Sequence, residues 1–271
     1  MFLIEVVAVI TLASAVGIIS AMIGVGGGFL VVPALVLLFF IPSHKAVGTS
    51  LTMIIFTALS STLAYSRQRR IDYSLGLILT MGTVPGAIMG AYVTRFVTAR
   101  GLSFLFGLFL VAVALRMMLA PERGAQKASE SKQRGWHRRL TDSKDVVFEY
   151  NANMKPGLAL SFLGGFTSGF FGVGGGAVMV PVMNLGMGVP IHIAVATSMF
   201  MMMFTSLSGV ATHLMLGNVL PDYALYLSIG VIGGAQVGAL IARRLKARYL
   251  ERIFGVFLVV VGLRMVLEYL S

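Results

Sequence analysis

A glycine-rich motif occurs twice in this chain, and its residues are well suited to binding a ligand. The stretch IGVGGGFLVVP at positions 23–33 returns as FGVGGGAVMVP at positions 171–181, which is 148 residues further along. Glycines let the backbone leave the helical conformation and approach a ligand closely. The N-terminus of a following helix has free N–H groups and a partial positive charge, which favour an anion. We therefore predict an anion site made by Gly26, Gly27, Gly28, Gly174, Gly175 and Gly176.

Uncharged polar side chains could complete this anion site. Thr49-Ser50 returns as Thr197-Ser198 at the same interval, near the start of a long apolar run in each half. A hydroxyl can donate to an oxyanion without bringing charge, although in a helix it more often bonds to its own backbone. Asn184 and Gln236 lie in apolar runs without polar repeat mates, so we expect them to make the two halves unequal.

Three histidines are candidates for a proton carrier. His44 and His192 share a PxH motif between a short and a long apolar run, and His213 lies deeper within a run. Histidine changes its charge near neutral pH, which suits proton coupling. A histidine at the start of a helix is more often a cap or a loop contact, so both interpretations stay open.

The composition predicts an all-α polytopic membrane protein. Hydrophobic residues make up 57% of the chain and charged residues 11%, against roughly 25% charged in soluble domains. The net charge of +11 comes from Lys and Arg in short loops, which indicates the positive-inside rule rather than a nucleic-acid partner. The chain has no cysteine, and it shows no metal-ligand spacing, paired carboxylates or nucleophile elbow. We expect no enzyme, metal site or cofactor.

The apolar runs divide into long ones that can span a bilayer and two short ones that cannot. They cover about 2–23, 29–41, 45–66, 73–95 and 101–119, then 157–171, 177–188, 192–214, 222–243 and 249–269. A hydrocarbon core is about 30 Å thick, whereas twelve helical residues reach only about 18 Å. The short runs 29–41 and 177–188 each follow GVGGG. We therefore predict a helix broken inside the membrane in each half, at a place that protein covers or that lines a cavity.

The repeat and the loop charges predict two inverted halves. Residues 1–120 form the first transmembrane repeat, 121–156 a basic linker and 157–271 the second repeat, each with a broken short helix followed by three spans. Arg67, Arg69 and Arg70 place one loop in the cytoplasm, whereas the matching loop 215–221 has no Lys or Arg. Internal repeats of inverted topology are typical of secondary transporters. The linker would be cytoplasmic, with part of it as a surface helix, and both termini outside.

Two further features qualify this topology. Arg95 and Arg100 fall in a loop that it assigns to the outside, against the positive-inside rule. The apolar N-terminus has Glu5 and no preceding Lys or Arg, so we expect a retained span rather than a cleaved signal peptide. The sequence leaves homo-oligomer assembly open.

Taken together, the paired GVGGG motifs that end at Pro33 and Pro181 and the PxH…TS blocks at 42–50 and 190–198 resemble the sulfite exporter TauE/SafE family. The resemblance covers both halves of the chain. It implies transport of small sulfur-containing anions, such as sulfite or organosulfonates, coupled to protons across the cell membrane. The alternatives are a passive anion channel, and a membrane scaffold that does not transport and acts through the basic linker. Replacing Gly27 or Gly175 by a bulky residue is expected to abolish transport in a protein that still folds.

Overall fold

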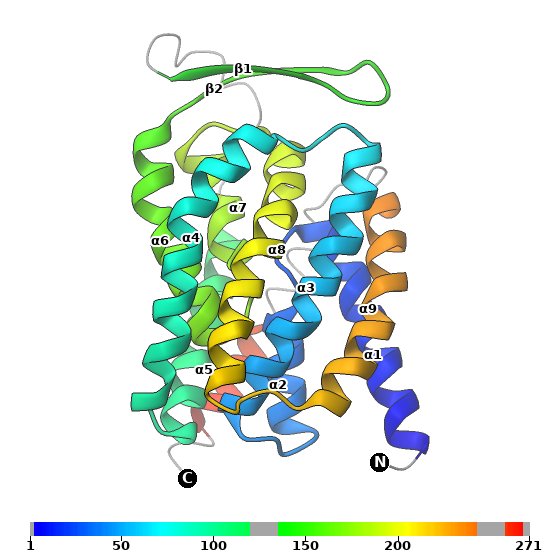
Figure 1. The fold of residues 1–271 in the computed structure, drawn as a ribbon, viewed down its shortest axis with the longest axis vertical. Helices are drawn as coiled ribbons and strands as arrows, with labels where there is room; N and C mark the ends of the chain where they lie inside the picture. The colour runs from blue at the N-terminus through cyan, green and yellow to red at the C-terminus, as the bar shows by residue number, and fades with distance from the viewer. Residues whose placement is uncertain (1–2, 120–134, 243–257, 268–271) are drawn as a thin grey trace.

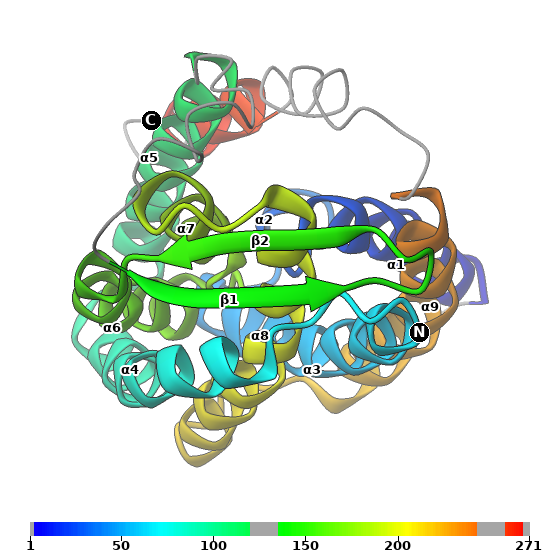
Figure 2. The ribbon, with the colours of Figure 1, turned by 90° about the horizontal axis from the view of Figure 1, so that it is seen from above.

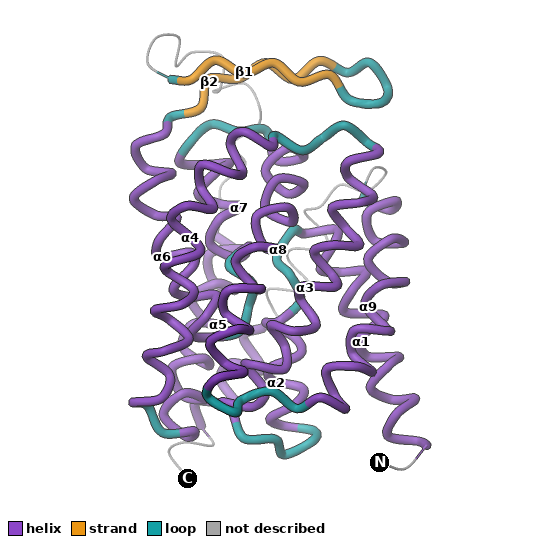
Figure 3. The backbone as a smooth tube through the Cα atoms, in the orientation of Figure 1, coloured by secondary structure: helices purple, strands orange, loops and turns teal. Residues whose placement is uncertain are grey.

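The computed structural model describes residues 3–119, 135–242 and 258–267, which form a helical bundle with a β-hairpin across one end (Figure 1). The first half contains α1 (Leu3–Ile23), α2 (Gly28–Leu37), α3 (Ser43–Arg67), α4 (Tyr73–Val93), a 3-10 turn (Thr94–Phe96) and α5 (Ala99–Leu119). The second half contains α6 (Met154–Phe171), α7 (Gly176–Pro181), a π-helical turn (Val182–Gly186), α8 (Ile191–Met215), α9 (Pro221–Ile241) and a helix over Leu258–Leu267. Figure 3 shows that helix dominates the backbone.

Five of the described helices are long and apolar enough to cross a membrane. These spans are Leu3–Ile23, Ser43–Arg67, Tyr73–Phe96, Ile191–Met215 and Pro221–Ile241. The prediction of a mostly helical chain with several spans is therefore confirmed. The two short runs after GVGGG also form short helices, Gly28–Leu37 and Gly176–Gly186. Of the predicted run 249–269, only 258–267 lies within the described residues.

Corresponding helices of the two halves run in opposite directions along the bundle (Figure 1). α1 and α3 run toward the hairpin, whereas α6 and α8 run away from it. The loop 68–72 lies at the hairpin end, and the loop 216–220 lies at the opposite end with the start of α1. The arginines of the first loop therefore share one end of the molecule with the hairpin.

Glycines outside the GVGGG motifs allow very close packing of two helix pairs. A side chain at Gly86 of α4 would overlap the backbone carbonyl of Phe162 in α6. Its repeat mate Gly234 of α9 lies in the same way against the carbonyl of Ser14 in α1. Such contacts between small residues hold helices together in lipid, because the hydrophobic effect does not drive helices to associate there.

In the described part of the linker, the chain forms a hairpin and not the surface helix that we expected for part of it. Its strands β1 (Trp136–Thr141) and β2 (Val147–Ala152) are antiparallel, with Arg138 opposite Tyr150. Alternate residues face the bundle, and the better buried ones are Trp136, Arg138, Leu140, Phe148, Tyr150 and Ala152. α6 begins at Met154, three residues before the predicted run. Residues 121–134 of the predicted linker lie outside the described part of the chain.

Two carboxylates dock the hairpin on the loop between α3 and α4. Asp72 is fully buried and accepts hydrogen bonds from Arg138 Nη2 at 2.6 Å, Arg138 Nε at 2.8 Å and the Tyr150 hydroxyl at 2.6 Å. Asp142, beside the hairpin turn, pairs with Arg70 at 2.9 Å. The Arg138 guanidinium also lies 4.4 Å from the centre of the Trp136 ring. A buried ion pair of this kind is costly to break by removing one partner.

The Asp72 carboxylate makes the docking of the hairpin depend on pH only at acid pH, where the carboxylate becomes protonated. Burial raises the pKa of Asp72, but hydrogen bonds from Arg138, Tyr150 and the Leu75 N–H outweigh burial and hold the pKa below its ordinary value of 3.8. A lowered carboxyl pKa stabilises the docked state above the ordinary pKa, and this stabilisation is lost as the pH falls through the lowered value.

We therefore predict that the fluorescence of Trp136, the single tryptophan of the chain, stays constant between about pH 8 and about pH 5. Its emission should change only below pH 3.8, as the hairpin separates from the bundle. A titration of the purified protein in detergent measures this directly. An emission change centred within the neutral range would contradict the docking account.

Candidate functional site

The two GVGGG motifs interrupt the helical conformation of the chain, the first between α1 and α2 and the second between α6 and α7. Three glycines of each motif have left-handed backbone conformations, with φ values between 71° and 90°: Gly24, Gly26, Gly27, Gly172, Gly174 and Gly175. Side chains other than glycine rarely adopt this region. All ten residues of the two motifs, 24–28 and 172–176, are buried. The backbone of both motifs is therefore buried within the protein, and the prediction that the two breaks lie inside a membrane stays a prediction.

The two breaks cross each other with their backbones in contact. A side chain on Gly28 would overlap the carbonyl oxygen of Gly172, and one on Gly176 would overlap that of Gly24. Ser50 of α3 donates to the Gly172 carbonyl at 2.8 Å, and Ser198 of α8 donates to the Gly24 carbonyl at 2.9 Å. Each half thus supplies a serine that binds the broken segment of the other half.

The threonines beside these serines lie elsewhere. Thr197 accepts a hydrogen bond from the Asp72 N–H at 3.0 Å, just before α4. Thr49 accepts one from the Leu220 N–H at 3.0 Å, just before α9. Neighbouring side chains on a helix point in different directions. In each Thr-Ser pair the serine therefore binds the broken segment of the other half, and the threonine binds a loop. Neither threonine lines the cavity described next.

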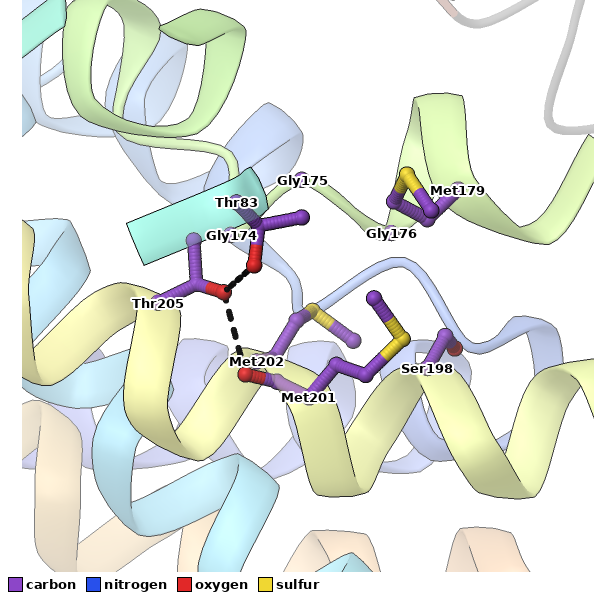
Figure 4. Close-up of a pocket in the computed structure, with 9 residues that line it drawn as sticks. All are labelled: Thr83, Gly174, Gly175, Gly176, Met179, Ser198, Met201, Met202 and Thr205. Atoms are coloured by element: carbon purple, nitrogen blue, oxygen red, sulfur yellow. Dashed lines mark hydrogen bonds between the residues drawn. The ribbon is translucent and has the colours of Figure 1, made fainter. Parts of the chain in front are cut away.

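A small cavity lies beside the second motif (Figure 4). It is lined by Thr83, Gly174, Gly175, Gly176, Met179, Ser198, Met201, Met202 and Thr205. Its volume of about 10 Å³ is close to what one water molecule needs. A sulfur oxyanion is larger than water, so the cavity must widen before it can hold one. Its three methionines are unbranched and flexible, which suits walls that have to move.

A pair of hydroxyls distinguishes this cavity from the equivalent place beside the first motif. Thr83 and Thr205 lie 2.7 Å apart, and Thr205 also donates to the Met201 carbonyl at 3.0 Å (Figure 4). At the repeat interval their counterparts are Val231 and Thr57. The place beside the first motif therefore has one hydroxyl where the cavity beside the second motif has two. Sequence reasoning missed both threonines, because only the packing of α4 on α8 brings them together.

The helix that follows the second break, α7, begins next to this cavity. The first backbone hydrogen bonds of α7 run from Val178 and Met179 to the Gly175 carbonyl, at 3.1 and 2.9 Å. The N–H groups before Val178 therefore precede the hydrogen-bond ladder of the helix. Such groups carry the partial positive charge of a helix N-terminus. With the π-helical turn, this helix extends over Gly176–Gly186.

Two buried serines beside the breaks were also missed. Ser20 of α1 and Ser168 of α6 are fully buried repeat mates, and neither hydroxyl has a hydrogen-bond partner in the described part of the chain. A Cβ atom on Gly27 would lie 3.3 Å from the Ser20 Cβ, and one on Gly175 would lie 3.4 Å from the Ser168 Cβ. A buried hydroxyl without a partner is costly. Their recurrence at 148 residues was the sequence signal that could have found them.

The two predicted amide side chains do not reach the cavity. Asn184 donates to the Val189 carbonyl at 2.9 Å, within the segment that joins α7 to α8. Gln236 donates to the Ser60 carbonyl at 2.8 Å and joins α9 to α3. Both amides are engaged in holding the fold, and neither lines the cavity.

The three histidines also lie away from the cavity. His44 Nε2 lies 3.0 Å from the Thr94 carbonyl and 2.9 Å from that of Val97. His213 is buried, and its Nε2 lies 2.9 Å from the Gly169 carbonyl. His192 is exposed at the start of α8, near the hairpin end. Their part in proton coupling stays a prediction.

The glycines at the breaks also change one expectation from the sequence. Gly27 and Gly175 have φ values of 86° and 79°, and a side chain on Gly27 would come within 2.7 Å of Val16. A bulky residue there would strain the backbone and the packing together. Loss of transport in such a variant would therefore not separate a binding defect from a folding defect.

Comparison with known proteins gives one family and several relatives. The chain matches the family described as "Sulfite exporter TauE/SafE" over residues 9–265. It is 36% identical over 270 residues to "Probable membrane transporter protein YunE" of Bacillus subtilis, which covers 97% of each chain. It is 28% identical over 267 residues to "Probable membrane transporter protein MJ0441" of Methanocaldococcus jannaschii, covering 93% of this chain and 92% of that protein. No solved structure matches the chain significantly.

Proposed function

This chain belongs to the sulfite exporter TauE/SafE family and is a membrane transporter, and we propose that its substrates are small sulfur-containing anions such as sulfite or an organosulfonate. We further propose that it is a secondary transporter coupled to protons. The observation that carries the proposal is the buried crossing of the two GVGGG breaks, with a hydroxyl-lined cavity beside it. Helix N-termini and hydroxyls bind an oxyanion without placing a full charge in the membrane.

Two inverted-topology repeats would build this transporter, residues 1–120 and 157–271, joined by the linker 121–156. The proposal is supported by the opposite directions of α1 and α6 in Figure 1. It is also supported by the reciprocal bonds Ser50 to Gly172 and Ser198 to Gly24. By the positive-inside rule, the linker and the Arg67–Arg70 loop would be cytoplasmic and both termini outside.

The anion would bind on the second half of the crossing. Gly174–Gly176, Ser198, Thr83 and Thr205 line one cavity there, and their N–H and hydroxyl groups would donate to the anion. Ser168 would add a donor from behind Gly175. At the equivalent place beside the first motif, the apolar Val231 of the second half stands where the cavity has Thr83, so we expect one anion site rather than two equal ones.

Alternating access would move one repeat against the other around this site. The cavity is too small for an oxyanion in the present conformation, so binding requires such a movement. The bonds from Ser50 to Gly172 and from Ser198 to Gly24 cross between the repeats and are the contacts that the movement would change. His44, His192 and His213 remain the candidates for carrying the coupled proton.

The proposal predicts saturable sulfite uptake by proteoliposomes that contain the purified chain. Uptake of radiolabelled sulfite should exceed that of empty liposomes, reach a maximum with concentration, and fall when unlabelled sulfite or a small organosulfonate competes. Uptake that rises without saturation would favour the passive anion channel. No uptake of any sulfur oxyanion, from a preparation shown to be folded, would reject the substrate class.

A further inference from the structure

The β1–β2 hairpin lies across the end of the bundle where α7 ends and α8 begins (Figures 1 and 2). We call this end of the bundle, which the hairpin of the linker covers, the linker end. We propose that the hairpin is the gate of the transport pathway at the linker end, and that the ion pair between Asp72 and Arg138 holds the gate shut. The inference rests on the proposed transport function. It is argued from the apolar cluster below the hairpin, from the contacts that pin the hairpin, and from one difference between the two halves.

A continuous apolar cluster connects the hairpin to the cavity. Its buried members include Leu79, Met183, Met187, Ile193, Met179 and Met201, and the hairpin side chains Trp136, Leu140 and Phe148 pack against it. Met179 and Met201 also line the cavity. The inner face of the hairpin therefore covers the apolar cluster, which separates the cavity from this end of the molecule. A hydrated anion could pass this cluster only if the hairpin and the methionines moved apart.

The hairpin is pinned at both ends as well as in the middle. The Ser143 N–H donates to the Gln68 carbonyl at 3.0 Å near the hairpin turn. The Asn153 N–H donates to the Met187 carbonyl at 3.1 Å where β2 leads into α6. Between these points, Arg138 and Tyr150 bind the buried Asp72 carboxylate. A second ion pair, Arg70–Asp142, holds the turn. The middle contact differs from it because one fully buried carboxylate binds two hairpin side chains, so we expect a single substitution at Asp72 to weaken the docking most.

Asp72 also connects the hairpin to the crossing. Its N–H donates to Thr197, and the next residue, Ser198, lines the cavity and binds the Gly24 carbonyl. A movement of the hairpin that displaces Asp72 would therefore reach α8 through the bond from Asp72 to Thr197, next to Ser198 in the chain. The proposed gate and the proposed anion site therefore both contact α8.

The other half has no equivalent of this pair. The repeat mate of Asp72 is Leu220, which binds Thr49 through its backbone only. The loop 216–220 lies at the end opposite the hairpin. An ion-pair gate would therefore act at the linker end alone, and the two ends of the pathway would open by different means.

The first test measures access to the cluster and needs no transport. Because the chain has no cysteine, Met183→Cys provides a single reporter thiol below the hairpin, in a fully buried position. Adding Asp72→Asn removes the charge but keeps a residue that can cap α4. We expect this change to raise the rate of labelling by a hydrophilic thiol reagent about tenfold, which corresponds to ~1.4 kcal/mol.

The matched control is Arg139→Gln, on the outer face of the same strand. Arg139 pairs with Glu149, and the two side chains are 66% and 54% exposed, so their pair contributes little. Labelling of Met183→Cys should be unchanged in this control. Equal labelling rates with and without Asp72→Asn would overturn the proposal.

The second test locks the hairpin without altering Asp72, so it decides the question even if Asp72→Asn does not fold. Ser143→Cys and Arg69→Cys place two exposed thiols at the turn, next to the bond between Ser143 and Gln68. A reducible bifunctional thiol reagent should stop sulfite uptake in the double variant, and a reductant should restore it. Each single-cysteine variant, treated alike, should keep its uptake. Full uptake by the crosslinked double variant would overturn the gate. Absence of uptake before crosslinking would instead count against the proposed function, and the labelling test would still report on the gate.

Discussion

Replacing Gly28 by alanine is expected to remove most of the folded protein from the membrane. Gly28 has an ordinary helical backbone, so strain in φ is not the reason. A Cβ atom there would overlap the carbonyl oxygen of Gly172, which belongs to the other broken segment. Backbone cannot move aside as a side chain can, and overpacking of this kind costs about 3 kcal/mol or more. Gly176→Ala, which would overlap the Gly24 carbonyl, should behave in the same way.

The matched control for this prediction is Gly233→Ala in α9. A Cβ atom on Gly233 would meet nothing within 4 Å, and alanine favours a helix by up to ~1 kcal/mol over glycine. Size-exclusion profiles and melting temperatures of the three variants in detergent measure the difference. A Gly28→Ala protein as stable as Gly233→Ala would mean that the two breaks do not cross as described.

Replacing Thr205 by valine should reduce sulfite uptake strongly while leaving the protein folded. Valine has nearly the shape of threonine, so the packing of α8 is kept and only the hydroxyl is lost. That hydroxyl lies in the cavity and bonds to Thr83. A hydrogen bond to a charged group contributes about 1.5–3 kcal/mol, so we expect uptake at limiting sulfite to fall by roughly tenfold or more.

The repeat supplies the control for this second prediction. Thr57 is the counterpart of Thr205, is equally buried, and makes the same bond to its own helix, to the Met53 carbonyl at 3.1 Å. Thr57→Val therefore loses the same intrahelical bond at the equivalent place beside the first motif, where Val231 is the counterpart of Thr83. It should keep most of its uptake. Equal losses in the two variants would show that the anion site is not confined to the cavity beside the second motif.

Much of the fold could be predicted because the repeated motif indicates where the short helix of each half begins. A motif that occurs twice with the same glycines and the same terminal proline cannot be two accidental loops, and the short helices do begin at Gly28 and Gly176. The long spans follow from apolar runs whose lengths match a bilayer. These features depend on residues close together in the sequence, so composition and spacing were sufficient.

The hairpin could not be predicted by the same reasoning. Strand prediction depends on alternation of apolar and polar residues, and the inner face of β1 places Arg138 between Trp136 and Leu140. That arginine is buried only because Asp72, which is distant in the sequence, lies beneath it. A long-range ion pair therefore hides the alternation that would otherwise mark the strand.

The candidate site was predicted in part for a related reason. Gly174–Gly176 and Ser198 line the cavity, but Thr49 and Thr197 face the loops instead. The sequence indicates which residues recur and not the direction in which adjacent side chains point. Thr83 and Thr205 have no common motif, and only the tertiary packing of two helices makes them a pair. Their role in binding rests on the tests above.

Radiolabelled sulfite flux in proteoliposomes, with and without an imposed pH gradient and against empty liposomes, decides whether this chain is a proton-coupled anion transporter. The account predicts saturable flux that the gradient drives against the sulfite concentration gradient, and the loss of most of that flux in Thr205→Val. Sulfite flux that only dissipates its own gradient, whatever the pH on either side, would contradict a proton-coupled anion transporter.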